Sequence, residues 1–256
     1  MPGGPPAEPK QQARATESSG LTAQDRERLK HVSVATISTC LYRAGIKVVC
    51  PSGVRPITPW LPRMVGEAYT LRFIPARDDV GGKSSYESGG NVHQRAFEEC
   101  PPGHVLVMDA RGETRGCSCG DLLIGRLKAR GCAGVVTDGG FRDTPDIALL
   151  EFPAYQREPA PAPSFGRLQA VELNVPIGCS DVAVYPGDVI VGDAEGIVVI
   201  PAKLAPRIAS ESHAMAQYDI FAAEEVARGR AIIGLYPATD AARAEFERWR
   251  KLRDPA

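Results

Sequence analysis

The stretch that most constrains the fold covers residues 120–146, with the sequence GDLLIGRLKARGCAGVVTDGGFRDTPD. Its first part places leucine and isoleucine for a helix that begins at a Gly-Asp turn, and GVVTDG is an apolar run typical of a buried strand. A glycine turn follows and presents Arg142 and Asp143 side by side. Helix, buried strand and turn in this order predict an α/β fold with a cation and a hard oxygen ligand at a strand end.

Composition narrows the class of protein. The chain has 256 residues and 43% hydrophobic content, with 30 Lys and Arg against 31 Asp and Glu. Its length suits one sizeable core, and its balanced charge gives no reason to expect nucleic acid as a partner. No apolar run approaches the roughly 18 residues of a membrane helix, and MPGGPPAEPKQQARATESSG lacks the apolar centre of a signal peptide. We therefore expect a cytoplasmic protein that does not contact membranes.

Residues 1–20 are rich in Pro, Gly, Gln and Ser, which predicts a disordered tail, and residues 21–256 are expected to form a single domain. Thr22 with Asp25 is a capping signal for a helix that runs to His31, and apolar spacing predicts a second helix over residues 35–44. From about residue 202 the pattern is mostly helical, with a break at residues 234–237. The chain therefore has helical segments at both ends.

The middle of the chain reads as many short strands. We expect them at residues 67–75, 104–110, 134–139, 163–165, 170–177, 188–193 and 196–201, with a hairpin turn at residues 193–196. Short strands with a few helices on the outside predict an α/β sandwich rather than a regular βαβ array.

The seven cysteines are an odd number, which favours free thiols over a disulfide framework. The close pair Cys117-Ser118-Cys119 is a CxC sequence with no second pair or nearby histidine. Small buried side chains explain it better than a zinc site does.

Each residue of the 120–146 stretch has a functional and a structural interpretation. Gly120 opens the helix start, where unpaired backbone amides can hold a carboxylate, and Arg142 has a planar fork suited to carboxylate or keto oxygens. Asp143 is a hard donor for Mg²⁺ or Mn²⁺. Asp146 would come within reach of the same metal site if the segment turns helically. The structural alternatives are a helix N-terminal acid for Asp121, a surface arginine at residue 142 and a turn aspartate at residue 143.

Three motifs in order resemble one family. GDLL, the Arg142-Asp143 pair and PGDVIVGDAEGIVVIP from residue 186 are similar to the RraA-like family, which contains 4-hydroxy-4-methyl-2-oxoglutarate and 4-carboxy-4-hydroxy-2-oxoadipate aldolases and a regulator of RNase E. VSVATISTCLYRAGI, GEAYTLRF and GHVLVMDARG agree as well, so the likeness covers about residues 32–201. Thr39-Cys40 departs from the family's usual Asp-Ala pair, and Asp121 stands where glutamate is more usual.

The resemblance implies a β/β/α swivelling-type sandwich that assembles as a homotrimer or homohexamer, with a required Mg²⁺ or Mn²⁺ and no organic cofactor. It places the metal on Asp143 and the substrate on Arg142. Asp146 matches an acid that the aldolases carry and that the founding RNase E regulator is reported to lack. The pyruvyl end of the substrate is expected to lie against Gly120, Asp121, Leu122 and Leu123.

These expectations combine into a metal-dependent lyase that cleaves a 4-hydroxy-2-oxo acid to release pyruvate, with oxaloacetate decarboxylation as a side activity. Arg142 would stabilise the enolate, and a water oriented by Asp121 or Asp146 would transfer protons. The alternative is a non-catalytic protein that regulates RNase E. A Schiff base on Lys47 and a substrate contact from His93 are weaker hypotheses, and the polar segment 74–94 is either a substrate-facing loop or a surface insertion.

Overall fold

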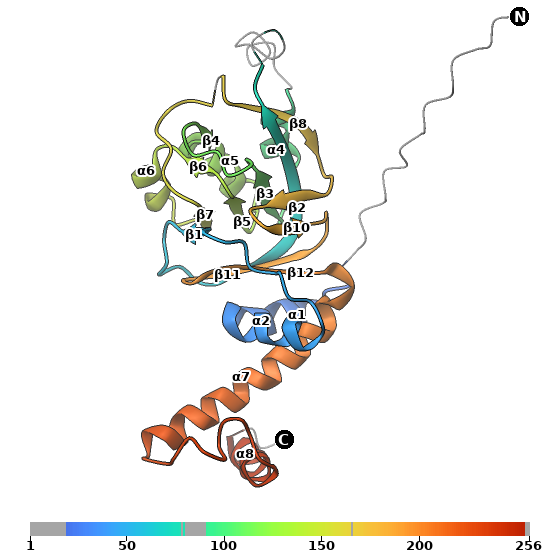
Figure 1. Ribbon diagram of the computed structural model, residues 1–256, viewed down its shortest axis with the longest axis vertical. Helices are drawn as coiled ribbons and strands as arrows, with labels where there is room; N and C mark the ends of the chain where they lie inside the picture. Colours follow the sequence, from blue (N-terminus) through green and yellow to red (C-terminus); the bar gives the residue numbers. More distant parts are fainter. Residues whose placement is uncertain (1–18, 78, 80–90, 165, 254–256) are drawn as a thin grey trace, which may run out of the picture.

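A computed structural model describes residues 19–77, 79, 91–164 and 166–253 (Figure 1). Apart from its last two residues, the predicted disordered tail lies outside the described residues, as does most of the segment 74–94. Ser19, at the start of the described chain, donates a hydrogen bond to Glu67 over 2.9 Å. In the described part of the chain, no helix combines the length and the apolar character that a membrane crossing requires.

One eight-stranded sheet organises the body. Its strand order is β1-β7-β5-β3-β2-β11-β12, with β8 paired to β2. The strands are β1 (Arg55–Pro56), β2 (Met64–Pro75), β3 (Val105–Asp109), β5 (Gly134–Thr137), β7 (Ala154–Gln156), β8 (Leu168–Leu173), β11 (Val189–Asp193) and β12 (Gly196–Ile200). The four strands β2, β3, β5 and β7 are parallel, and the other pairings are antiparallel.

The sheet curls until its two ends meet, so it is a nearly closed barrel. Arg55, on β1, donates from its guanidinium to the carbonyl of Glu195, beside β12, over 2.8 Å. The interior is filled by inward-facing apolar residues such as Val107, Val136 and Ile190, all fully buried. The hairpin of β9 (Ile177–Cys179) and β10 (Val182–Val184) contributes to the same cluster.

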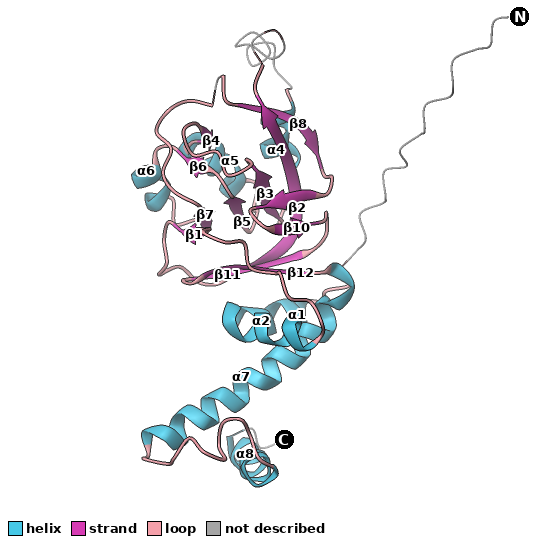
Figure 2. Cartoon of the chain, viewed as in Figure 1, coloured by secondary structure: helices cyan, strands magenta, loops and turns pink. Residues whose placement is uncertain are grey.

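Helices cover the outside of this sheet in two groups (Figure 2). The first group connects the parallel strands: α4 (Val92–Glu99) packs on β2 and β8, α5 (Asp121–Ala129) packs on β5, and α6 (Thr144–Leu149) packs against α5. The second group packs on β11 and β12, and consists of α1 (Ala23–Lys30), α2 (Val34–Arg43) and the start of α7 (Ala205–Ala227), which follows the short 3₁₀ helix η1 (Ala202–Leu204). Both groups bury apolar stripes, which supplies most of the stability of such helices.

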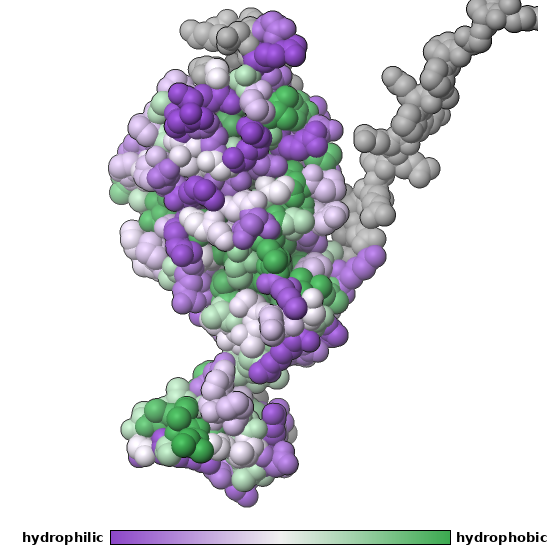
Figure 3. All heavy atoms as spheres, in the orientation of Figure 1, coloured by the Kyte–Doolittle hydropathy of each residue, from purple (hydrophilic) through white to green (hydrophobic). Residues whose placement is uncertain are grey.

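The rest of α7 runs away from the sheet, and α8 (Asp240–Arg253) packs against its far end (Figure 1). A separate small aromatic core holds this arm together, with Phe221 and Phe246 at ring centroids 5.8 Å apart. Apolar surface gathers over the end of α7 and the segment that follows it (Figure 3), where Ile233 is 90% exposed. The arm therefore carries apolar surface that the described residues leave exposed.

The sequence predictions for the fold class and most elements are confirmed. Thr22 and Asp25 form a complete capping box at α1, and Asp193 pairs with Gly196 at the end of the β11–β12 hairpin. The strand predicted at residues 163–165 is wrong: Pro163 is in no regular element, Ser164 lies in a bend, and residue 165 is outside the described residues. Prolines at 161 and 163 lack the backbone donors that a ladder needs. The parallel half is also more regular than expected, because a helix joins each successive pair of strands.

Candidate active site

A pocket of about 200 Å³ opens where α5 begins. Its floor is β4 (Cys117–Cys119), which pairs in parallel with β6 (Gly140–Phe141) behind it. Six of the seven residues that the sequence predicted for the site line this pocket: Gly120, Asp121, Leu122, Leu123, Arg142 and Asp143. Segments about 20 residues apart in the chain thus meet because β4 and β6 are neighbours.

The start of α5 presents the backbone amides of its first turn to the pocket. Gly120 is the N-cap in an extended conformation, and no side chain caps this end of the helix. The first hydrogen bond of the helix runs from Ile124 N to Gly120 O over 3.2 Å, so the amides before Ile124 have no carbonyl within the helix. Leu127 anchors the buried face, whereas Leu122 is 84% exposed at the rim of the pocket. These amides and the helix dipole favour a bound carboxylate.

Asp143 has an unusual backbone conformation that directs its side chain over Gly120. Its φ of 57° and ψ of 36° lie in the left-handed region, which costs free energy for a residue other than glycine and is often found at functional sites. A Cβ built on Gly120 would lie 2.8 Å from Asp143 Oδ2 and 3.1 Å from Arg142 Cγ. The carboxylate therefore occupies the space that glycine leaves open.

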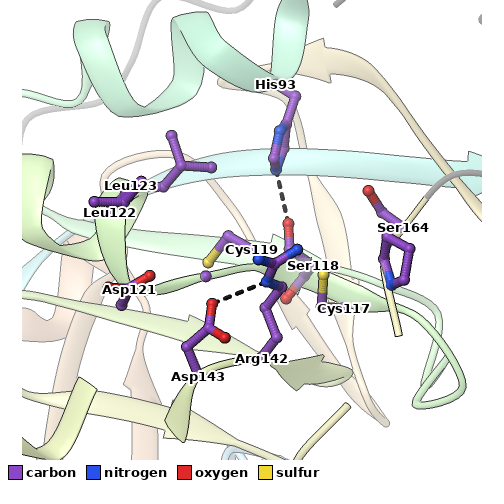
Figure 4. Close-up of a pocket in the computed structure, with 12 residues that line it drawn as sticks. His93, Cys117, Ser118, Cys119, Asp121, Leu122, Leu123, Arg142, Asp143 and Ser164 are labelled. Carbon is purple, nitrogen blue, oxygen red and sulfur yellow. Dashed lines mark hydrogen bonds and ion pairs between the residues drawn. The ribbon is translucent and has the colours of Figure 1, made fainter. Parts of the chain in front are cut away.

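The backbone of Arg142 is held by β4, whereas its guanidinium is half exposed. Its amide donates to the carbonyl of Cys119 over 3.1 Å. Its Nε donates a hydrogen bond to Asp143 Oδ2 (Figure 4). The two atoms are 2.8 Å apart, and the side chain of Arg142 is 47% exposed. The hydrogen bond to Asp143 raises the pKa of the guanidinium above its usual value, so the group is a permanent cation. A ligand carboxylate or a metal ion could exchange with this surface ion pair at small cost.

Sequence reasoning gave little or no role to six residues that also line the pocket: His93, Cys117, Ser118, Cys119, Pro163 and Ser164. The CxC sequence was correctly predicted to be buried, but β4 is too short for periodicity to reveal it as the neighbour of the Arg-Asp turn. Burial raises the pKa of the thiols of Cys117 and Cys119. Both are therefore protonated at neutral pH, which suits neither a nucleophile nor a zinc ligand.

Asp146 and Lys47, two other residues considered from the sequence, lie outside the pocket, as does Asp138. The segment after Asp143 does turn helically, but Asp146 is exposed on the first turn of α6 and does not line the pocket. Lys47 is exposed and lines a different hollow beside α2. Asp138 is 2% exposed and accepts three backbone amides at 2.7–3.1 Å, so it ties loops together at the ends of β3 and β5.

The donor set of the pocket fits a hard divalent cation that keeps several waters. Asp121 and Asp143 are the two carboxylates on its wall. Among the described residues, no group of three or more His, Cys, Asp or Glu is placed to hold a metal ion. Mg²⁺ and Mn²⁺ are commonly bound by one or two carboxylates plus water, whereas a structural zinc site needs four protein ligands.

The barrel-like sheet, its outer helices and the pocket between β4, β6 and α5 define an RraA-type α/β protein. Residues 34–199 match the RraA-like family, described as Aldolase/RraA, and the chain belongs to this family.

Some relatives of this chain are named as aldolases, and others have no assigned activity. A protein of Halalkalibacterium halodurans named "Putative 4-hydroxy-4-methyl-2-oxoglutarate aldolase" is 38% identical over 136 residues, which are 52% of this chain and 64% of that protein. The match thus spans less than two thirds of that relative's length. An uncharacterized protein of Methanocaldococcus jannaschii is 30% identical over 203 residues, covering 79% of this chain and 88% of its own.

Two solved structures share the fold. An uncharacterized protein from Pseudomonas syringae pv. tomato superposes with a TM-score of 0.73 at 23% identity, covering 84% of this chain and 98% of that chain. Streptomyces coelicolor RraAS2 is described as an unusual member of the RNase ES inhibitor RraA protein family. It superposes with a TM-score of 0.67 at 31% identity, covering 78% of this chain and 96% of that chain.

Proposed function

We propose that this chain is a divalent-metal-dependent lyase that cleaves a 4-hydroxy-2-oxo acid, of the 4-hydroxy-4-methyl-2-oxoglutarate type, by a retro-aldol reaction. Aldolase names among its relatives support the reaction class. The observation that carries the proposal is the position of the Asp143 carboxylate over Gly120, beside the Arg142 guanidinium and the free amides of α5. This arrangement offers one anion-binding helix end, one cation and one hard oxygen ligand within a single pocket.

The costly feature of the reaction is the negative charge that develops on the keto oxygen when the C3–C4 bond breaks. The amides of Leu122 and Leu123 would bind the substrate carboxylate, and Arg142 would donate hydrogen bonds to the carboxylate and the developing enolate oxygen. Fixed donors of this kind contribute about 3–4 kcal/mol each in comparable sites. The chain therefore holds the pyruvyl half of the substrate with residues whose backbones are fixed by β4 and β6.

Two carboxylates complete the proposed chemistry. Asp143, with Asp121 nearby on the pocket wall, would hold Mg²⁺ or Mn²⁺, which supplies Lewis-acid stabilisation of the enolate oxygen when bound. Asp121 would orient a water that takes the proton of the C4 hydroxyl and returns one to C3 of the enolate. Asp146 would act on that water only from outside the pocket wall. Decarboxylation of oxaloacetate yields the same enolate and is the proposed side activity.

The active form is proposed to be a homotrimer or homohexamer with a small oxo acid as its substrate. Leu122 at the pocket rim is 84% exposed and Ile233 on the arm is 90% exposed. Large exposed apolar side chains of this kind are typical of protein interfaces. A second copy of the chain would cover them and close the pocket.

The competing proposal is a non-catalytic protein that binds and regulates RNase E. The likeness to RraAS2, at 31% identity over 96% of that chain, favours it. An inhibitor that acts through an outer surface has no need of the Arg-Asp-x-x-Asp arrangement, so the presence of Arg142, Asp143 and Asp146 favours the enzyme.

Pyruvate release, coupled to lactate dehydrogenase, tests the proposal. The substrates are 4-hydroxy-4-methyl-2-oxoglutarate and oxaloacetate, each with Mg²⁺, with Mn²⁺ and with EDTA, and each without protein to subtract metal-catalysed decarboxylation. The proposal predicts turnover that EDTA abolishes and added metal restores. A folded protein without turnover on either substrate would favour the inhibitor, and RNase E inhibition would then be assayed directly.

A further inference from the structure

We infer that His93 is a positioning residue, which holds the backbone of Ser118 and thereby fixes the strand from which both Gly120 and Arg142 are placed. Its kinetic consequence rests on the proposed function, but its structural consequence does not. Sequence reasoning treated His93 only as a weak hypothesis for a substrate contact. The structure supports a different role, through β4.

His93 is locked in place at the top of the pocket. It is the second residue of α4 and is 7% exposed. Its ring packs between Phe73 and Phe97, at centroid distances of 5.7 Å and 5.3 Å. These contacts fix the ring plane, so its Nε2 is held toward the pocket floor (Figure 4). A side chain held this firmly can set the position of a neighbouring backbone.

The hydrogen bond of His93 satisfies a backbone carbonyl on the edge of β4 that faces away from β6. Its Nε2 lies 2.7 Å from the carbonyl oxygen of Ser118, and because a carbonyl only accepts, Nε2 carries the hydrogen. Ser118 is fully buried, and β6 is the only partner strand of β4 in the described part of the chain. The carbonyls of a strand alternate in direction, and Cys119 already uses its own toward β6. Without His93, the Ser118 carbonyl would be a buried acceptor lacking this partner.

The position of β4 matters because its last residue, Cys119, is bonded to Gly120 and accepts a hydrogen bond from Arg142. Ser118 Oγ donates to the carbonyl of Gly140 over 3.0 Å, and Cys119 O accepts from the amide of Arg142 over 3.1 Å. Gly120 follows Cys119 directly and begins α5. A shift of β4 would therefore move the carboxylate-binding amides and Arg142 together.

His93 is also poorly suited to direct proton transfer. Burial lowers its pKa to about 4, so the ring is neutral at neutral pH. Its Nε2 hydrogen is already used on Ser118. The groups that share its pocket include Asp121, Arg142 and Asp143, and these are the ones that touch the proposed substrate.

Two variants and one control test the inference. His93→Phe keeps the aromatic packing and removes the donor, whereas His93→Gln keeps an amide donor near the Nε2 position. Thr70→Val removes a comparable hydrogen bond away from the pocket, from fully buried Thr70 to the carbonyl of Val175 at 2.5 Å. Hydrogen–deuterium exchange of the peptide spanning residues 117–123 and the kinetics of pyruvate release are measured for all three.

We expect faster exchange in residues 117–123 and a kcat reduced on the order of 100-fold in His93→Phe, since small misplacements of catalytic groups cost that much. His93→Gln should restore both, with a pH profile of the wild-type shape, and Thr70→Val should change neither. Normal exchange in His93→Phe, or no rescue by glutamine, would overturn the inference. If the wild-type protein releases no pyruvate, the exchange result alone decides, so failure of the proposed function is distinguishable.

Discussion

Asp143 holds its carboxylate directly over Gly120, so that a Cβ at residue 120 would lie 2.8 Å from Oδ2. A Cβ essentially never lies this close to a heavy atom that is not bonded to it, so any side chain at residue 120 must displace the carboxylate. The backbone of Gly120 is extended, with φ of −125°, and would accept alanine without strain. The requirement for glycine therefore comes from the site and not from the fold.

Gly120→Ala should fold normally and lose about 100-fold in kcat/KM, because Asp143 and Arg142 must move together. Gly125→Ala, in the same helix, is the matched control: its Cβ meets only Leu150 Cδ2 at 4.0 Å. Alanine there should stabilise α5 by roughly 0.5–1 kcal/mol and leave turnover unchanged. Steady-state kinetics and thermal unfolding of both variants check this, and equal activity of the two would show that the close approach has no functional role.

Arg142→Ala and Asp143→Asn should each lower turnover by about 1,000-fold or more, through loss of the cation at the enolate and of the metal ligand. Asparagine tolerates the left-handed backbone at residue 143, so the second variant isolates the charge. Arg126→Ala is the control, since Arg126 is also 47% exposed and ion-paired, to Glu98 on the surface. Near-normal rates in either site variant, measured with a thermal unfolding midpoint like that of the control, would refute the assignment.

Asp121 and Asp146 should differ in importance, although the sequence gave them the same role. Asp121 lines the pocket, whereas Asp146 is exposed on α6 outside it. Asp121→Asn is expected to reduce kcat by about 100-fold, in the range of general acid–base contributions, and Asp146→Asn by less than about 10-fold. The kcat of each variant, measured across pH 5.5–9, distinguishes the contribution of Asp121 from that of Asp146. A larger loss in Asp146→Asn would place the proton-transfer group outside the pocket described here.

The buried histidine predicts a pH dependence of stability. In the unfolded chain His93 binds a proton below about pH 6.5, while in the folded protein its pKa is about 4 because of burial. The unfolded state therefore binds more protons between these values, and stability falls as the pH drops, by at most about 3 kcal/mol from this group. Urea unfolding at pH 7 and pH 4.5 should show a smaller loss for His93→Gln than for the wild type; equal losses would contradict the buried neutral ring.

Much of the fold could be predicted from the sequence because its signals are local. The capping box at Thr22, the apolar runs of β3, β11 and β12, and the turn at Asp193 each act over a few neighbouring residues. The strands that were missed, β1, β4, β6, β7, β9 and β10, have two or three residues and exist only through their pairing. Such pairing is set by tertiary context, which weak strand propensities do not report.

For the site as well, the local signals could be read from the sequence, whereas the tertiary pairing could not. Residues 120–123 and the pair Arg142-Asp143 could be found because a helix start and a glycine turn are recognisable in sequence. Placing them in one pocket required β4 to lie beside β6, and the role of His93 depends on a carbonyl of β4. Asp146 stays a prediction, because it is exposed on the first turn of α6 and is not among the residues that line the pocket.

Exchange of the methyl protons of pyruvate with D₂O tests most directly whether this pocket stabilises a pyruvate enolate, and it needs no knowledge of the second product. Loss of the methyl signal is followed by proton NMR, with Mg²⁺ or EDTA, for the wild type, Asp143→Asn and Arg126→Ala. We predict metal-dependent exchange in the wild type and in Arg126→Ala, and none in Asp143→Asn or with EDTA. Wild-type protein that leaves the methyl signal unchanged in the presence of metal would contradict the claim.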